Sequence, residues 1–142
     1  QVVFLDTAEH RWVEELGGMN VFFIFNDGTI ITPPLGGTIL PGITRSSIIE
    51  LARGQGRTVE ERRYSYDEWR DDAKSGRLVE AFACGTAAVI SSIGVVRSSA
   101  CDLTSGNGGT GAIADELRSE LVGIQRRRIP GPDGWVHMVE MT

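Results

Sequence analysis

The segment NVFFIFNDGTIIT, residues 20–32, restricts the possible folds of this chain more than any other stretch. After the leading Asn20 come five β-branched or aromatic residues, a composition typical of strands. The Asn-Asp-Gly sequence at 26–28 favours a tight hairpin turn, and residues 29–32 can return as the second strand. We therefore expect an antiparallel hairpin over residues 20–32.

Further strands are indicated on both sides of this hairpin. Apolar and β-branched runs predict strands over residues 1–6, 78–84 and 87–96, and 58–65 is a weaker, more polar candidate. Residues 96–111 begin as a strand and end as a glycine-rich loop. The short Gly-Thr step at 85–86 separates two of these strands and leaves backbone N–H groups exposed.

Two or three helices are predicted, from three segments of the chain. The first follows Pro41-Gly42, with Thr44 or a neighbouring serine as its cap, and stops at a glycine near residue 54 or 56. The second covers residues 65–76 and starts with the capping-box spacing of Ser65 and Glu68. The third covers 112–127 and has one apolar face. Because there is no repeat and no linker, we expect residues 1–142 to form one strand-rich α+β domain.

Charge and composition exclude several classes of protein. The net charge is −5, and no basic surface predicts nucleic-acid binding. The two cysteines match no metal-binding spacing, and no stretch is long and apolar enough to span a membrane. We expect reduced thiols, a cytoplasmic protein, and neither a metal nor a membrane partner. The chain opens at Gln1 inside an apolar run and without Met, which suggests a fragment.

Two short motifs are suited to holding anions. LPGITR, residues 40–45, places a tight turn directly before a helix, where free N–H groups and the positive end of the helix dipole attract phosphate. CGTA, residues 84–87, offers a close backbone approach, successive N–H donors and a hydroxyl. Each motif alone is more often an ordinary capped helix or turn. We infer as a hypothesis that Thr44 and Thr86 hold one phosphate from two sides.

The ordinary catalytic side chains give weaker signals. His10 and His137 lie near opposite ends of the chain, outside any motif, and Lys74 is the only lysine. Lys74 follows two aspartates, which favour its charged form and make it a poor catalytic amine. Glu14 and Glu15 precede a Gly-Gly pair and a buried strand, so one carboxylate could enter the interior and would need a partner. A protonated heterocyclic nitrogen, an arginine or a backbone cap would each serve.

Taken in order, these motifs resemble the branched-chain aminotransferases, which are fold-type IV pyridoxal-phosphate enzymes. The resemblance covers essentially the whole chain and rests on these segments: FLDTAEHRWVEELGGMNVFF, TPPLGGTILPGITRSSIIELA, VEERRYSYDEW, VEAFACGTAAVISSIG, ELRSELVGIQ and the late Trp135. It implies the C-terminal part of the large domain of the D-amino acid aminotransferase-like fold, a strand-rich pseudo-barrel with a few flanking helices.

The resemblance also implies an activity. Members of the family use pyridoxal 5′-phosphate to move an amino group between leucine, isoleucine or valine and 2-oxoglutarate, and they form homodimers. Glu15 would pair with the pyridine nitrogen of the cofactor and keep it protonated. Leu40 would pack against the ring.

The two anion-holding motifs acquire distinct roles by the same resemblance. The N–H groups of Ile43 and Thr44 would hold the cofactor phosphate together with the hydroxyl of Thr86. The N–H groups of Thr86 and Ala87 would receive the substrate carboxylate.

Two departures from the family pattern are visible. Ala88 and Ser91 stand where some members carry a redox-active cysteine pair. The lysine that binds the cofactor lies upstream of the position matching Gln1 in the family, and Lys74 does not match it. We therefore expect this chain alone to be inactive. The alternatives are a D-amino acid aminotransferase or an aminodeoxychorismate lyase of the same fold, or a non-catalytic binding remnant.

Overall fold

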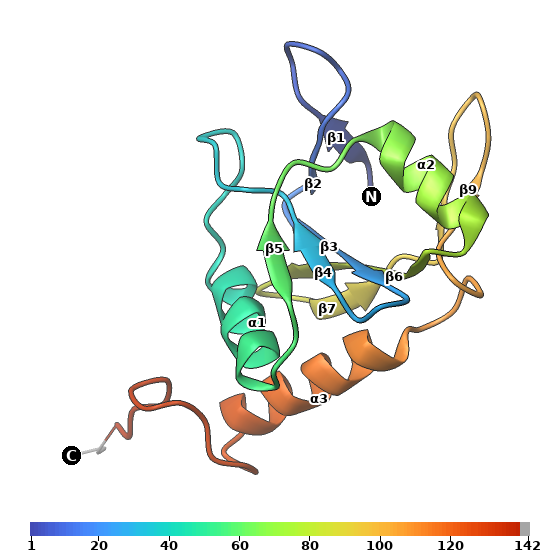
Figure 1. The fold of residues 1–142 in the computed structure, drawn as a ribbon. Helices are drawn as coiled ribbons and strands as arrows, with labels where there is room; N and C mark the ends of the chain where they lie inside the picture. Colours follow the sequence, from blue (N-terminus) through green and yellow to red (C-terminus); the bar gives the residue numbers. More distant parts are fainter. Residues whose placement is uncertain (140–142) are drawn as a thin grey trace.

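The computed structural model describes residues 1–139, and its centre is a five-stranded sheet (Figure 1). The strands lie in the order β5-β4-β3-β6-β7. Their bounds are β3 Asn20–Phe25, β4 Ile30–Thr32, β5 Val59–Glu61, β6 Leu78–Gly85 and β7 Val89–Ser92. All neighbours are antiparallel except β4 and β5, which run parallel. The α+β class predicted from the sequence is confirmed.

Two small sheets flank the central one. β1 (Val3–Leu5) pairs with β2 (Val13–Leu16), and β8 (Val95–Val96) pairs with β9 (Leu103–Thr104). β2 was not predicted, because its four residues, VEEL, carry two adjacent carboxylates and form no apolar run. The strand predicted over 87–96 divides into β7 and β8.

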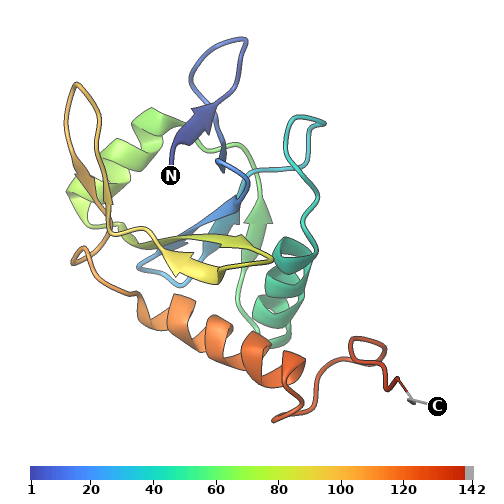
Figure 2. The ribbon, with the colours of Figure 1, turned by 180° about the vertical axis from the view of Figure 1, so that it is seen from behind.

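Helices cover both faces of the central sheet. α1 (Ile43–Gly54) and α3 (Ala112–Gln125) lie on one face, and α2 (Tyr66–Ser75) lies on the other, as the two opposite views show (Figures 1 and 2). None of the helices within residues 1–139 is both long and apolar enough to cross a membrane.

The core forms on both faces of β3, whose six residues are all buried. Phe22 stacks on Phe82 at 4.9 Å between ring centroids, on the face covered by α1 and α3. Phe23 points to the other face and packs against Tyr64 and Trp69. A strand covered on both faces needs no alternation of apolar and polar residues, which explains the continuous run in the sequence.

The local signals of the sequence are confirmed with one exception. Phe25 N–H donates to the Thr29 carbonyl in the predicted hairpin, where Gly28 has φ +84°. The capping box of Ser65 and Glu68 is present at α2. The cap predicted for α1 is wrong: Gly42 is the N-cap, no side chain caps the helix, and Thr44 lies inside its first turn.

Candidate functional site

The first turn of α1 presents free backbone donors. Gly42 has an extended conformation, with φ −66° and ψ 135°, and its carbonyl accepts the first helical bond from Ser46. Within residues 1–139, no side chain caps the helix, and its first turn contains no acidic residue. The N–H groups of Ile43 and Thr44 therefore point out of the helix start with the positive end of its dipole behind them.

The starts of the other two helices are covered by carboxylates. Glu68 closes the capping box of α2, where its side chain accepts from Ser65 N–H. Glu80 of β6 reaches the start of α3 and accepts from the N–H groups of Ile113 and Ala114 at 3.0 and 2.9 Å. In the described part of the chain, α1 is thus the helix whose start remains suited to an external anion.

The loop before α1 is held against the first residue of β3. The buried Asn20 donates from Nδ2 to the Leu40 carbonyl at 2.9 Å. A Cβ atom on Gly42 would lie only 2.5 Å from Asn20 Oδ1, so only glycine lets the turn approach this closely. The geometry at the helix start therefore depends on a side chain that is distant in the sequence.

The β6–β7 hairpin carries the second anion-holding motif to the same end of the sheet. Its tip lies beside the start of α1 in both views (Figures 1 and 2). Gly85 ends β6 against Met19, whose Cγ would lie 3.2 Å from a Cβ at this position. Thr86 and Ala87, at the tip, are exposed. The hairpin tip, which carries Thr86, thus lies beside the start of the helix that carries Thr44, and a phosphate held between the two threonines stays a prediction.

The hairpin contains a strained residue directly after this tip. Val89 has φ +60°, a left-handed conformation that a β-branched residue rarely adopts. A three-residue hairpin loop commonly needs one such residue, and glycine would supply it without strain. Strain of this kind persists where the surrounding structure fixes a functional geometry.

Glu15 lies on β2, next to the turn that leads into β3. Gly17, with φ +57°, makes this turn, so Glu15 and Asn20 stand on its two arms. The adjacent Glu14 accepts a hydrogen bond from Thr38 Oγ1 at 2.8 Å. Glu15 is half-buried, and among residues 1–139 no side chain or backbone group forms a hydrogen bond or ion pair with its carboxylate. Its carboxylate is available to a ligand.

Two apolar side chains are exposed beside the free amides of α1. Leu40 is 66% exposed and Ile43 is 83% exposed. Exposed apolar groups next to an anion-holding turn can pack against the flat, apolar part of a ligand whose charged end the turn holds. The role that the family resemblance implies for the Leu40 side chain, packing against the cofactor ring, stays a prediction.

Lys74 and His10 lie away from this region, whereas Cys84, next to Gly85 in β6, is buried inside the sheet. Lys74 is exposed on α2, across the sheet from α1, and His10 is exposed in the β1–β2 loop. Burial raises the pKa of the Cys84 thiol to about 12. In the described residues no group of three or more His, Cys, Asp or Glu side chains could hold a metal ion.

A hollow of about 940 Å³ lies between β1 and the segment 91–100. None of the six predicted site residues lines it. Its lining includes residues of β1 and β8, which belong to the two small sheets, and none from the turns at 40–45 and 84–87.

Sequence reasoning missed Asn20 and Arg45. Asn20 opens an otherwise apolar strand, which is a detectable signal because a buried amide needs a partner. Arg45 is 3% exposed in the first turn of α1, and the sequence offers no sign of its burial.

Comparison with known proteins identifies similar sequences. Residues 1–96 match the family model described as Amino-transferase class IV. The chain is 46% identical over 137 residues to a probable branched-chain-amino-acid aminotransferase of Streptomyces coelicolor, and 47% identical over 139 residues to a branched-chain-amino-acid aminotransferase of Mycolicibacterium smegmatis. Each match covers 96% of this chain and 38% of the relative, so the chain spans less than half the length of these proteins.

Solved structures with the same fold carry similar names. The branched-chain amino acid aminotransferase of Escherichia coli matches with a TM-score of 0.78 and 28% identity, over 94% of this chain and 41% of that one. A second branched-chain amino acid aminotransferase, from the organism abbreviated T.th., was solved with pyridoxamine 5′-phosphate. It matches with a TM-score of 0.77 and 29% identity, over 94% of this chain and 39% of that one.

Proposed function

This chain belongs to the class IV aminotransferases, and we propose that it forms part of a branched-chain amino acid aminotransferase that works with pyridoxal 5′-phosphate. The relatives at 46–47% identity carry this activity in their names, and one structural neighbour is described with pyridoxamine 5′-phosphate. Because the chain spans 38% of its relatives' length, the activity is proposed for the complete protein.

The observation that carries this proposal is the uncovered start of α1, which has no acidic residue in its first turn. The N–H groups of Ile43 and Thr44 would hold the phosphate of the cofactor, and the hydroxyl of Thr86 would approach from the hairpin tip. A dianionic phosphate is stabilised by such donors and by the helix dipole. Both turns are packed against the rest of the protein, Gly42 against Asn20 and Gly85 against Met19.

The other predicted residues would bind and orient the rest of the cofactor. The Glu15 carboxylate, without another partner in the described chain, would keep the ring nitrogen protonated, and the exposed Leu40 would pack on the ring. When bound, pyridoxal phosphate supplies an electron sink for charge that develops on the amino acid. The N–H groups of Thr86 and Ala87 would hold the substrate carboxylate near the ring.

Substrates and assembly follow from the same proposal. The substrates would be branched-chain amino acids and 2-oxo acids, and the complete protein would be a cytoplasmic homodimer. The amine that links to the cofactor would come from a lysine outside residues 1–142, because Lys74 lies on the opposite side of the sheet.

The test is amino transfer by the complete protein. We expect L-leucine to donate its amino group to 2-oxoglutarate, with pyridoxal phosphate required. Thr86→Ala should weaken cofactor affinity by about tenfold because it removes one charge-assisted hydrogen bond. Thr110→Ala, an exposed threonine in the loop before α3, is the matched control. Preference for D-alanine would favour the D-amino acid aminotransferase alternative, and the absence of both transfer and cofactor binding would refute the proposal.

A further inference from the structure

Arg45 occupies an unfavourable place for a cation. It lies in the first turn of α1, where the helix dipole disfavours positive charge, and it is 3% exposed. Removing a guanidinium from water at such a site is costly unless hydrogen bonds and a counter-charge compensate. The contacts of Arg45 therefore indicate what its burial achieves.

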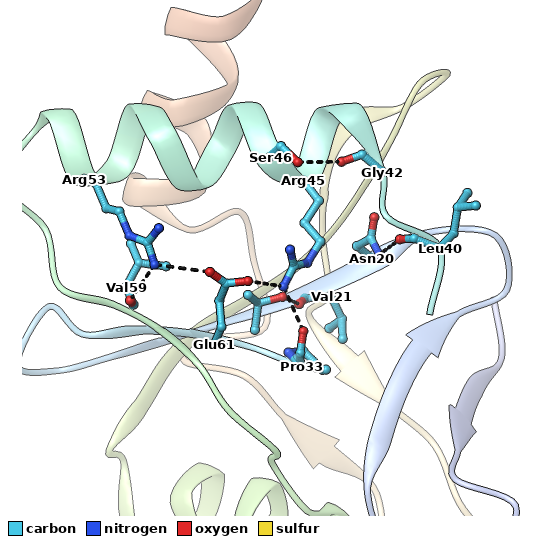
Figure 3. Close-up of polar contacts among 11 residues, drawn as sticks. Asn20, Val21, Pro33, Leu40, Gly42, Arg45, Ser46, Arg53, Val59 and Glu61 are labelled. Atoms are coloured by element: carbon cyan, nitrogen blue, oxygen red, sulfur yellow. Dashed lines mark hydrogen bonds and ion pairs between the residues drawn. The ribbon is translucent and has the colours of Figure 1, made fainter. Parts of the chain in front are cut away.

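One guanidinium nitrogen of Arg45 joins three elements (Figure 3). Nη2 donates to the Pro33 carbonyl at 2.9 Å and to Oε2 of Glu61, on the edge strand β5, also at 2.9 Å. The hydrogen bond from Arg45 lowers the pKa of the Glu61 carboxyl, so the ion pair persists into mildly acidic solution. Arg53, further along α1 and half exposed, donates to the other carboxylate oxygen at 3.3 Å.

Asn20 makes the corresponding contact at the other end of the same loop. The loop leaves β4 at Pro33 and returns to α1 through Leu40. Arg45 holds the Pro33 carbonyl, and Asn20 Nδ2 holds the Leu40 carbonyl (Figure 3). Both side chains are buried, and both donate to backbone carbonyls of the loop rather than to solvent. The loop is thus fixed at its two ends, next to the free N–H groups of Ile43 and Thr44.

We propose that Arg45 and Asn20 are positioning residues, which fix the loop 33–42 so that the first amides of α1 converge on the cofactor phosphate. This inference rests on the proposed function. The hydrogen bonds of both side chains go to protein groups: Arg45 would act through Pro33 and Glu61, and Asn20 would act through Leu40. Hydrogen-bond donors held by such supporting contacts are ready for the ligand before it arrives, and this readiness is what gives an anion site its affinity.

The two contacts also explain why an arginine is needed. Arg45 Nη2 serves a carbonyl and a carboxylate at once, in a residue that is only 3% exposed. A lysine ends in a more strongly hydrated ammonium group on a shorter and more flexible stem, so it would not hold both oxygens in this buried place as the guanidinium does. Arg45→Lys should therefore resemble Arg45→Met in its effect on the phosphate.

The experiment compares two ligands that differ only in the phosphate. Dissociation constants for pyridoxal 5′-phosphate and for pyridoxal are measured with the complete protein and its variants, and their ratio is the phosphate selectivity. We expect Arg45→Met and Asn20→Ala each to reduce this selectivity by about tenfold, the size of effect typical of residues that orient a ligand-binding group. Affinity for pyridoxal should change by less than about twofold.

Arg53→Met is the matched control, because it makes the same substitution on the same helix and removes a partner of the same carboxylate. It should leave the selectivity within about twofold of the unsubstituted protein. A merely structural role would lower the affinities for both ligands together and leave their ratio unchanged, which would overturn the positioning role. If Arg45→Met fails to fold, Asn20→Ala decides by the same ratio.

The two proposals fail in different ways. An unsubstituted protein that binds pyridoxal as tightly as pyridoxal phosphate would refute the phosphate turn itself, and the positioning role with it. A phosphate-selective protein whose selectivity survives both Arg45→Met and Asn20→Ala would refute the positioning role alone. The ³¹P resonance of the bound phosphate gives a second readout: it should shift in these two variants and stay unchanged in Arg53→Met.

Discussion

Replacing Gly42 by alanine tests the close contact at the start of α1. The new Cβ would lie 2.5 Å from Asn20 Oδ1, well inside the 3.4 Å of an ordinary contact. Crowding in a packed site costs about 1–3 kcal/mol, and a displaced Asn20 would also lose its bond to the Leu40 carbonyl. Alanine recovers about 0.4–1 kcal/mol by restricting the unfolded chain. We expect a net loss of about 1–3 kcal/mol.

Gly36→Ala is the control within the same loop. A Cβ at Gly36 would meet no atom within 4 Å, and Gly36 is outside the left-handed region. Only the effect on the unfolded chain remains, so Gly36→Ala should be neutral or stabilising by up to about 1 kcal/mol. The difference between the two variants therefore isolates the contact between the turn and Asn20.

Urea unfolding followed by tryptophan fluorescence measures this difference. With a slope of about 2 kcal/mol/M, a loss of about 2 kcal/mol lowers the midpoint by roughly 1 M. The slopes should be equal, since both substitutions leave the buried surface unchanged. If Gly42→Ala unfolds at the same urea concentration as Gly36→Ala, or at a higher one, the turn does not rest on Asn20.

Three further predictions concern individual titrating groups. Burial raises the pKa of Tyr64, whose hydroxyl donates to Asp72 at 2.9 Å. Tyr64→Phe should therefore lower the free energy of unfolding by about 2 kcal/mol in urea melts. The unsubstituted protein should lose stability above pH ~10, because there only the tyrosine of the unfolded chain ionises. Because Cys84 is buried and Cys101 is partly exposed, Ellman's reagent should label one thiol in the native protein and two in urea. Backbone N–H donors, of which Trp12 N–H has the largest effect, lower the pKa of Asp6 to about 2. The ionised Asp6 therefore stabilises the folded protein above pH ~4, and this stabilisation is lost as the pH falls through 2. In Asp6→Asn, the stability measured in urea melts should consequently fall less steeply with decreasing pH.

The parts of the fold that the sequence predicts are those with local causes. The hairpin at 20–32 follows from a turn sequence between two apolar runs, and the capping box of α2 follows from two residues three apart. The sequence does not predict β2, because this strand is stabilised by pairing with β1 across a loop and not by its own composition. The division between β7 and β8 has a similar cause: Gly94 lies against the backbone of Gly108, a contact between distant segments.

The same distinction between local and long-range causes applies to the candidate site. The two anion-holding turns can be predicted, because proline, glycine and threonine at those spacings expose backbone donors wherever the chain goes. What fixes the turns cannot be predicted in this way. Asn20 and Arg45 act on carbonyls 20 and 12 residues away, and only the folded sheet brings them there. The wrong prediction of a Thr44 cap has the same origin: a threonine near a helix start was assigned the common local role.

The position of the site also follows from where local stability rules are broken. Carboxylates accept hydrogen bonds at the starts of α2 and α3. The one at α3 belongs to Glu80 of β6, the strand that ends at Gly85. α1 begins without one, and beyond Gly85 the hairpin residue Val89 is strained where glycine would be relaxed. An uncovered helix start and a strained hairpin each lower stability. Proteins keep such departures mainly where function requires them. The uncovered helix start and the strained residue border the same region, which lies between α1 and the β6–β7 hairpin. That coincidence supports the proposed position of the site independently of any likeness to known enzymes.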